Sequence, residues 1–242
     1  VLTILETVSF DEVSFFHNLI SHLSYYGLPV PAPRRTLDGM TSTIFCSRPT
    51  LLMPKMEGEP ATNVGTDEAR ALGATLGELH DATASYDHSR DNALGVSALE
   101  EALAGAALGA STADAAKAAL AAAAALPQDL PTGVIHGDLT RSSVLFEEGE
   151  VSAVTGFFKA CNERLIEDVA IAANDWCTSP DGSLDEERLA ALLAGYADER
   201  EPTAGELDAL PTLRALAAAR SVIRAEQSGA DAEFYAKVLA AC

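Results

Sequence analysis

The feature that most constrains the fold of this chain is a short polar loop between two apolar stretches near its middle. Residues 133–135 (Gly-Val-Ile) lead into the loop and residues 144–146 (Val-Leu-Phe) follow it. His136 and Asp138 lie between them, two residues apart. Short apolar runs bounded by polar residues are typical of buried strands. The pattern therefore predicts two strands that hold a His and an Asp on their connecting loop.

A carboxylate on a braced loop suits phosphoryl transfer. In that reaction one carboxylate accepts the proton of the attacking hydroxyl, while other groups hold the phosphates and the metal. A plainer reading stays open, because His and Asp also occupy turns for purely local hydrogen-bonding reasons. His136 and Asp138 could then be no more than a polar strand connection.

Further motifs follow the loop at regular intervals. A second apolar run covers residues 151–158, and Lys159-Ala160-Cys161-Asn162 comes directly after it. Residues 165–177 carry Asp168, Asn174, Asp175 and Trp176. Together with His136-Gly137-Asp138-Leu139, these motifs resemble the homoserine kinases that are built on the aminoglycoside phosphotransferase fold, within the choline kinase-like superfamily. The resemblance extends from Val1 to about Arg224.

The resemblance implies a role for each residue of the loop. Asp138 would be the base or would orient the substrate hydroxyl, His136 would brace the loop, and Arg141 could reach a phosphate. It also implies ATP as the phosphoryl donor. The acceptor would be a small amino-acid alcohol, homoserine being the acceptor of the family.

Two more groups of residues take their expected roles from the resemblance. Residues 53–58 resemble the hinge between two lobes, where backbone groups meet adenine, so Leu52, Met53 and Lys55 are the expected nucleotide contacts. The open alternative is that Pro54 and Gly58 mark an ordinary strand exit. The expected substrate contacts are Asn162, Asn174, Asp175 and Trp176.

Two departures from the family pattern concern the metal. Ser143 stands where the family loop carries an Asn ligand, and Gly156 stands where the next strand carries the Asp that holds Mg²⁺. Mg²⁺ needs oxygen ligands, and a glycine supplies none from a side chain. The family implies ATP and Mg²⁺, but we expect no protein ligand set for the metal and inefficient turnover of ATP.

The expected fold is an α/β (α+β) protein kinase-like fold. We expect residues 1–56 to form a partial N-terminal lobe with the hinge, and residues 57–242 to form a mostly helical C-terminal lobe. The small lobe is expected to be incomplete, because a strand begins at Val1 without the glycine-rich hairpin that precedes it in the family. Apolar spacing predicts helices over residues 10–26, 66–80, 184–196 and 206–226, with Pro202 and Pro211 as breaks. The alanine-rich tract 102–126 predicts one or two helices, and residues 43–46 and 50–53 predict a hairpin.

Composition limits the partners and the location. The chain has 242 residues, 48% of them hydrophobic, and a net charge of −20 from 36 acidic and 16 basic residues. Such a surface repels nucleic acids and anionic membranes. The four cysteines are scattered, so we expect buried free thiols and no zinc site or disulfide framework. No signal peptide or long apolar run is present, which predicts a cytoplasmic protein; its oligomeric state is open.

Three functions remain from the sequence. The first is a homoserine kinase-type phosphotransferase that makes O-phospho-L-homoserine from L-homoserine, a step of threonine biosynthesis. The second is a catalytically impaired, pseudokinase-like homologue that keeps the fold without phosphoryl transfer. The third is another small-molecule kinase of the aminoglycoside phosphotransferase family, for an aminoglycoside or a sugar. Ala160-Cys161-Asn162 and residues 174–177 favour the homoserine branch over the third.

Overall fold

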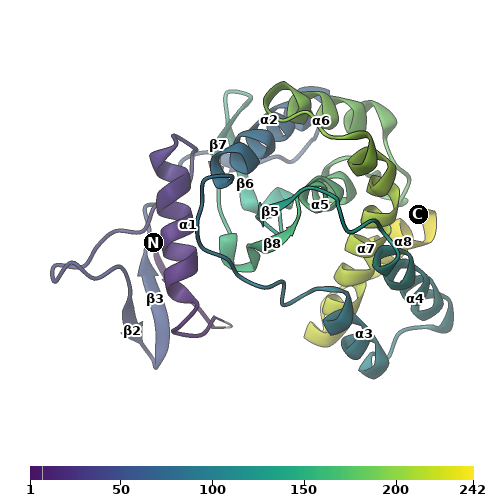
Figure 1. Ribbon diagram of the computed structural model, residues 1–242, viewed down its shortest axis with the longest axis horizontal. Coiled ribbons are helices and arrows are strands. Elements are labelled where there is room, and N and C mark those ends of the chain that lie inside the picture. Colours follow the sequence, from purple (N-terminus) through teal and green to yellow (C-terminus); the bar gives the residue numbers. More distant parts are fainter. Residues whose placement is uncertain (7) are drawn as a thin grey trace.

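A small sheet and one helix lie on one side of the molecule, and a larger, mostly helical part lies on the other (Figure 1). The computed structural model describes residues 1–6 and 8–242. Every strand pair in these ranges is antiparallel. This arrangement confirms the predicted protein kinase-like fold with a mostly helical C-terminal part.

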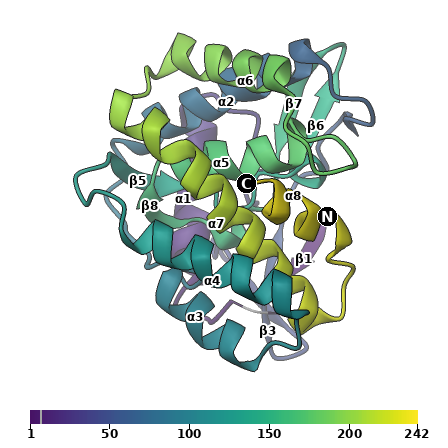
Figure 2. The same ribbon diagram turned by 90° about the vertical axis from the view of Figure 1, so that its right-hand side faces the viewer.

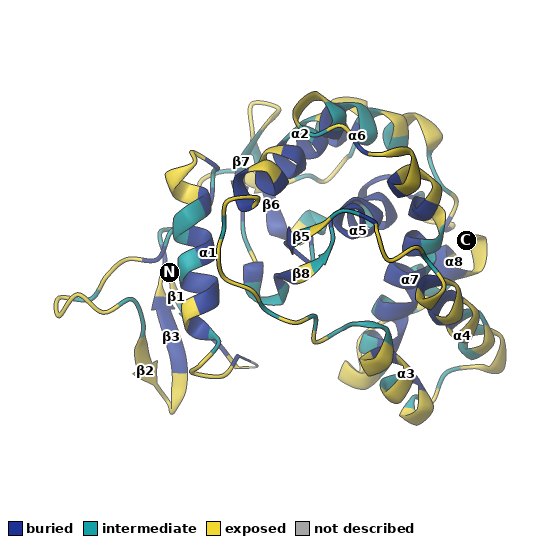
Figure 3. Cartoon of the chain, viewed as in Figure 1, coloured by how far each residue is buried: buried dark blue, intermediate teal, exposed yellow. Residues whose placement is uncertain are grey.

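The small sheet has the strand order β1-β3-β2. Its strands are β1 (Leu2–Ile4), β2 (Thr43–Phe45) and β3 (Arg48–Leu52), and β2 and β3 form the predicted hairpin. Helix α1 (Val13–Tyr25) packs here through Phe16, Ile20 and Leu23, which are buried at the three- and four-residue spacing of an apolar helix face. All three residues of β2 are exposed at the edge (Figure 3).

Two long helices of the larger part touch almost backbone to backbone. These are α2 (Thr66–Thr83) and α6 (Glu186–Glu199). A Cβ added to Gly73 would lie 2.0 Å from the carbonyl oxygen of Leu192, and one added to Gly195 would lie 2.0 Å from that of Arg70. Any side chain at either position would push the helices apart, so glycine at both positions permits this approach.

Helix α7 (Ala204–Ser228) is the longest element and crosses the larger part (Figure 2). It runs through Pro211, where the sequence predicted a break, so that expectation is wrong. Helix α8 (Glu233–Ala241) packs on α7 and was not predicted. The alanine-rich tract forms two helices, α3 (Val96–Gly105) and α4 (Ala110–Ala124), and α4 also packs on α7.

The two strands predicted around the polar loop belong to different sheets. Strand β5 (Thr132–Ile135) pairs with β8 (Cys161–Arg164), whereas β6 (Val144–Glu147) pairs with β4 (Glu59–Pro60) and β7 (Glu150–Val154). The loop therefore passes from one sheet to the other. It ends in a short 3-10 turn, η1 (Arg141–Ser143), and a second such turn, η2 (Phe157–Lys159), follows β7. Helix α5 (Ile166–Trp176) follows β8.

One apolar core joins both sides of the molecule. It includes Leu5 and Phe16 of the small side together with Leu72, Val169 and Leu213 of the larger side. The division between residues 1–56 and 57–242 stays a prediction. Across the described residues, no helix is long and apolar enough to cross a membrane.

The four cysteines are unpaired, and they differ in exposure. Cys161 and Cys177 are buried, as predicted, whereas Cys46 and Cys242 are exposed. The expectation of four buried thiols is therefore half wrong.

Candidate active site

The polar loop leaves the buried end of β5 through a glycine that its neighbours require. Ile135 and His136 are fully buried. Gly137 has a φ of +76°, and a Cβ there would lie 2.5 Å from the carbonyl oxygen of Lys159. The chain can turn here only without a side chain. The turn brings Asp138 from the core to a half-buried position.

A buried carboxylate holds this turn from below. Asp168, near the start of α5, accepts the backbone N–H of His136 at 2.6 Å and that of Gly137 at 2.8 Å. His80 of α2 approaches the same carboxylate at 3.3 Å. Burial by itself would raise the pKa of Asp168, but the hydrogen bonds from His80 and Gly137 and the nearby imidazoles lower it below its ordinary value. Asp168 is therefore an ionised brace for the loop.

The brace continues into the helices behind it. The guanidinium of Arg200 donates to the hydroxyl oxygen of Tyr196 at 2.7 Å, and that hydroxyl lies 2.8 Å from Nδ1 of His80. A carboxylate only accepts hydrogen bonds, so Nε2 of His80 donates to Asp168, while Nδ1 is in hydrogen-bond contact with the Tyr196 hydroxyl. The loop is thereby tied to α2 and α6.

His136 fixes the loop from within. Its Nε2 lies 2.8 Å from the carbonyl oxygen of Thr155 and therefore carries the proton, while Nδ1 accepts the backbone N–H of Asp138 at 3.2 Å. Burial lowers the pKa of His136, so the ring is neutral at pH 7. His136 thus joins the loop to the end of β7.

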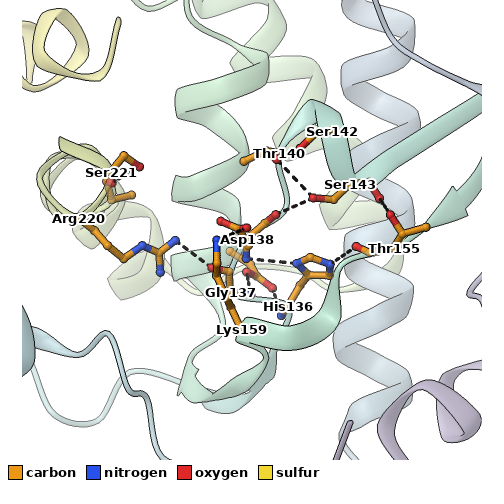
Figure 4. A network of polar contacts seen from close by, with 12 residues as sticks. His136, Gly137, Asp138, Thr140, Ser142, Ser143, Thr155, Lys159, Arg220 and Ser221 are labelled. Carbon is orange, nitrogen blue, oxygen red and sulfur yellow. Dashed lines mark hydrogen bonds and ion pairs between the residues drawn. The ribbon is translucent and has the colours of Figure 1, made fainter. Parts of the chain in front are cut away.

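The carboxylate of Asp138 forms an ion pair with the ammonium of Lys159, from the turn η2 (Figure 4). Both side chains are mostly shielded from solvent. Arg220 of α7 points to the same place and donates to the carbonyl oxygen of Gly137 at 2.9 Å. The side chain predicted to activate a hydroxyl therefore lies among cations.

Arg141 and Asp175 meet at the far end of the loop. The backbone N–H of Arg141 donates to Asp175 at 2.5 Å, and its guanidinium lies 3.6 Å from the same oxygen. The carboxylate of Asp175 thus caps the turn η1. The Arg141 side chain is partly exposed beside it.

Ser143 and Gly156, the two positions at which the sequence resemblance predicts the family's metal ligands, face each other. A Cβ added to Gly156 would lie 3.7 Å from Oγ of Ser143. That oxygen already donates to the carbonyl oxygen of Asp138 at 2.9 Å. Within residues 1–6 and 8–242, no three His, Cys, Asp or Glu side chains gather as a metal site would require. The residues present do not fit a Mg²⁺ site made of carboxylate and amide oxygens.

A mostly apolar cavity of about 290 Å³ lies between the small sheet and this face of the loop. Met53 and Lys55 are on its wall, together with Gly156 and Phe158. Leu52 is not on the wall, and about half of its side chain is exposed. Contacts of Leu52, Met53 and Lys55 with a nucleotide stay a prediction.

Comparison with known proteins identifies the family. The model of the phosphotransferase enzyme family matches residues 1–202. The chain is 37% identical to the homoserine kinase of Methylobacterium nodulans over 230 residues, which are 92% of this chain and 72% of that protein. The chain belongs to the phosphotransferase enzyme family. Its relatives make it a small-molecule kinase by descent.

Solved structures share the fold of this phosphotransferase. An amicoumacin kinase in complex with AMP-PNP, Ca²⁺ and Ami superposes with a TM-score of 0.76 at 18% identity, over 94% of this chain and 73% of that one. A microcompartment-associated aminopropanol kinase gives the same TM-score at 16% identity, over 99% and 81%. These likenesses agree with the protein kinase-like fold.

The predicted substrate contacts of the phosphotransferase do not all meet at Asp138. Asp175, in α5, contacts the loop at Arg141, and Asn162 is exposed, with its amide oxygen accepting the backbone N–H of Arg90 at 2.8 Å. Asn174 is buried, with its amide paired to Arg214 at 2.7 and 3.1 Å. Trp176 is fully buried against Phe146. Direct substrate contact by these four residues stays a prediction.

Sequence reasoning missed the brace and the cations. The sequence motif contains Asp168 but predicts no role for it, because its partners His80, His136 and Gly137 come from other segments of the chain. Lys159 follows the apolar run 151–158 directly, and no local pattern relates it to Asp138. Arg220 and Arg224 are four residues apart, which places them on one face of α7, and this spacing was the available signal.

Proposed function

We propose that this phosphotransferase moves the γ-phosphoryl group of ATP to the hydroxyl of L-homoserine, as its relatives' name suggests. One observation carries the proposal. Asp138 sits half-buried on a loop that Asp168 and His136 hold in place; Thr155, which binds His136, lines the apolar cavity, and Lys159 pairs with Asp138. The similarity to the homoserine kinase of Methylobacterium nodulans supports homoserine as the acceptor.

The reaction uses Asp138 as the acceptor of one proton. The hydroxyl oxygen of the acceptor forms a bond to the γ-phosphorus as its proton passes to the Asp138 carboxylate. The bond between that phosphorus and the bridging oxygen breaks, and ADP leaves with the electron pair. Lys159 forms an ion pair with the Asp138 carboxylate and so holds it in position before the step.

The donor would occupy the cavity beside Met53 and Lys55. Its apolar wall suits an adenine ring, and Phe157 and Phe158 close the end near Gly156. The amicoumacin kinase with AMP-PNP supports a nucleotide for this fold. Arg141, partly exposed at the end of the loop, is the proposed contact for a phosphate oxygen.

Metal binding separates this proposal from its rival. Ser143 and Gly156 supply no carboxylate, so we expect weak ATP binding that Mg²⁺ hardly changes. That observation favours a second candidate, a catalytically impaired homologue that binds the small molecule and transfers little. A kinase for another small molecule, such as an aminoglycoside, is the remaining alternative within the family.

A direct assay tests the proposal. Purified protein is incubated with ATP and L-homoserine, and O-phosphohomoserine is measured by mass spectrometry, with L-threonine and an aminoglycoside as comparison acceptors. We expect product only from L-homoserine and its loss, by at least about a hundredfold, in Asp138→Asn. Equal rates on the aminoglycoside would transfer the assignment to another kinase, and binding of homoserine without product would favour the impaired homologue.

A further inference from the structure

A second cavity, of about 220 Å³, opens on the other side of Phe158 from the apolar one. Its wall carries Arg90, Lys159 and Arg224, with Asn92 beside them. We call this cavity the cationic pocket. Three positive side chains on so small a surface are unusual in a chain with 16 basic residues and a net charge of −20.

The cations of the pocket are unequally neutralised. Arg90 is bound by Glu12 at 2.8 and 2.9 Å and also donates to the carbonyl oxygen of Ala160. In the described parts of the chain, neither Arg224 nor the neighbouring Arg220 pairs with a carboxylate. The pocket therefore keeps positive charge that its own residues do not cancel.

The crowding of positive charges affects the pKa of Lys159. Burial lowers the pKa of Lys159, the ion pair with Asp138 raises it, and the positive charges of Arg224 and Arg220 lower it further. An anion placed between Lys159, Arg220 and Arg224 would reduce the repulsion between their positive charges. The free pocket is thus electrostatically prepared for a negative ligand.

The position of the cationic pocket next to Asp138 indicates which kind of anion it would bind. Lys159 lines the pocket and also binds Asp138. An anion held in the pocket therefore lies close to the hydroxyl that Asp138 would activate. The cavity suited to the nucleotide lies on the opposite side of Phe158. A small acceptor with a hydroxyl at one end and a carboxylate at the other can bridge Asp138 and the cationic pocket.

We propose that the cationic pocket binds the carboxylate of an amino-acid acceptor, with Arg224 as the main contact and Lys159 and Arg220 beside it. The inference rests on the proposed function and adds a source of specificity to it. An amino alcohol without a carboxylate would lack this contact. An amino acid without a hydroxyl would keep it.

Binding measurements on four ligands test the pocket. The wild-type protein is titrated by calorimetry with L-homoserine, L-2-aminobutyrate (which lacks the hydroxyl), 3-aminopropan-1-ol (which lacks the carboxylate) and inorganic phosphate. Arg224→Gln should weaken both amino acids about tenfold and change 3-aminopropan-1-ol by less than about twofold. Arg224→Lys should restore part of the loss, because it keeps the charge.

A matched variant controls for loss of any arginine. Arg70→Gln removes a half-exposed arginine of α2 that pairs with Asp198, and it should leave all four affinities unchanged. Thermal melting of each variant checks that it is folded. If Arg224→Gln does not fold, the comparison is made between wild type and Arg224→Lys, where the amino acids should still lose more than 3-aminopropan-1-ol.

The outcomes separate the two proposals. Arg224-dependent binding of L-2-aminobutyrate without phosphorylation of L-homoserine would support the pocket and reject the proposed function. Phosphorylation of L-homoserine with an unchanged KM in Arg224→Gln would reject the pocket and leave the function standing. Equal loss of all ligands, or loss of phosphate binding alone, would also overturn the pocket, and an absence of amino-acid binding would overturn both.

Discussion

The two faces of the Asp138 loop are built in opposite ways. Towards α5, the loop rests on a fully buried carboxylate, Asp168, which accepts two of its backbone N–H groups. Towards β7, it faces Ser143 and Gly156, which offer one hydroxyl and no carboxylate. The shape of the loop is therefore fixed by contacts inside the protein.

This difference separates the residues that hold the loop in shape from the residues that would contact a ligand. The contacts that Asp168 and His136 make with the loop do not depend on the side chains at positions 143 and 156, whereas Ser143 adds one hydrogen bond to the carbonyl oxygen of Asp138. A change on the Asp168 face should damage folding. A change on the Gly156 face should alter ligand binding and leave the fold intact.

The largest effect is expected from Asp168→Asn. An amide cannot accept both loop N–H groups and the His80 hydrogen bond as the carboxylate does, so buried donors lose their partner. We expect the free energy of unfolding to fall by about 4 kcal/mol, measured by urea denaturation. The control Asp198→Asn breaks a half-exposed ion pair with Arg70 and should cost less than about 1 kcal/mol. Similar costs for both variants would contradict the bracing role.

Glu167, the neighbour of Asp168, is a second buried carboxylate, and its titration shows how burial of a carboxylate affects the stability of the fold. Burial raises the pKa of Glu167 from 4.5 to about 7, and the negative charge of Glu163 adds to this shift. Between these pH values the folded state binds a proton that the unfolded state has released, so stability is lost as the pH rises. The loss should reach about 3 kcal/mol by pH 8.

Glu167→Gln removes this titration. Urea unfolding at pH 5 and pH 8 should show a smaller drop in the variant than in the wild type. An identical drop in both proteins would mean that Glu167 does not cause it.

Placing metal-binding side chains at positions 143 and 156 should change the binding of ATP and Mg²⁺. Ser143→Asn combined with Gly156→Asp should make ATP binding Mg²⁺-dependent by about tenfold, whereas each single change should do little, because one ligand cannot hold the ion. Calorimetric titration of ATP with and without Mg²⁺ measures the effect. Gly156→Ala is the matched control, since it imposes the same strain at a φ of +84° without a carboxylate. A Mg²⁺ effect of similar size in the wild type would show that other oxygens already hold the ion.

The smallest effect is expected from Ser143→Ala. This change removes one hydrogen bond to the carbonyl oxygen of Asp138 and should cost about 1 kcal/mol. The midpoint of urea unfolding measures it. A cost as large as that of Asp168→Asn would mean that the Gly156 face also holds the loop.

Much of the local structure could be predicted from the sequence. The apolar runs at residues 133–135 and 144–146 gave strands β5 and β6, and the apolar spacing within 66–80 gave most of α2. The hairpin of β2 and β3 was predicted as well. The distant strand partners could not be predicted in this way, because the pairing of β5 with β8, and of β6 with β4, joins segments that no local pattern relates.

The site shows the same limit. Asp138 and His136 were predicted because their motif is continuous in the sequence. Lys159 and Arg220 reach Asp138 and Gly137 from other elements, and only the folded backbone brings them there. Pro211 misled for a related reason, since the buried contacts of α7 on both sides outweigh the local preference of proline to end a helix.

The buried Trp176 gives this molecule an optical reporter of its own. It is the single tryptophan of the chain, lies against Phe146 and follows Asp175, which caps the end of the Asp138 loop. Its indole is shielded from water, so native emission should come at short wavelength and move to the red when α5 separates from β6. Fluorescence from this one ring therefore reports the state of the loop without any label.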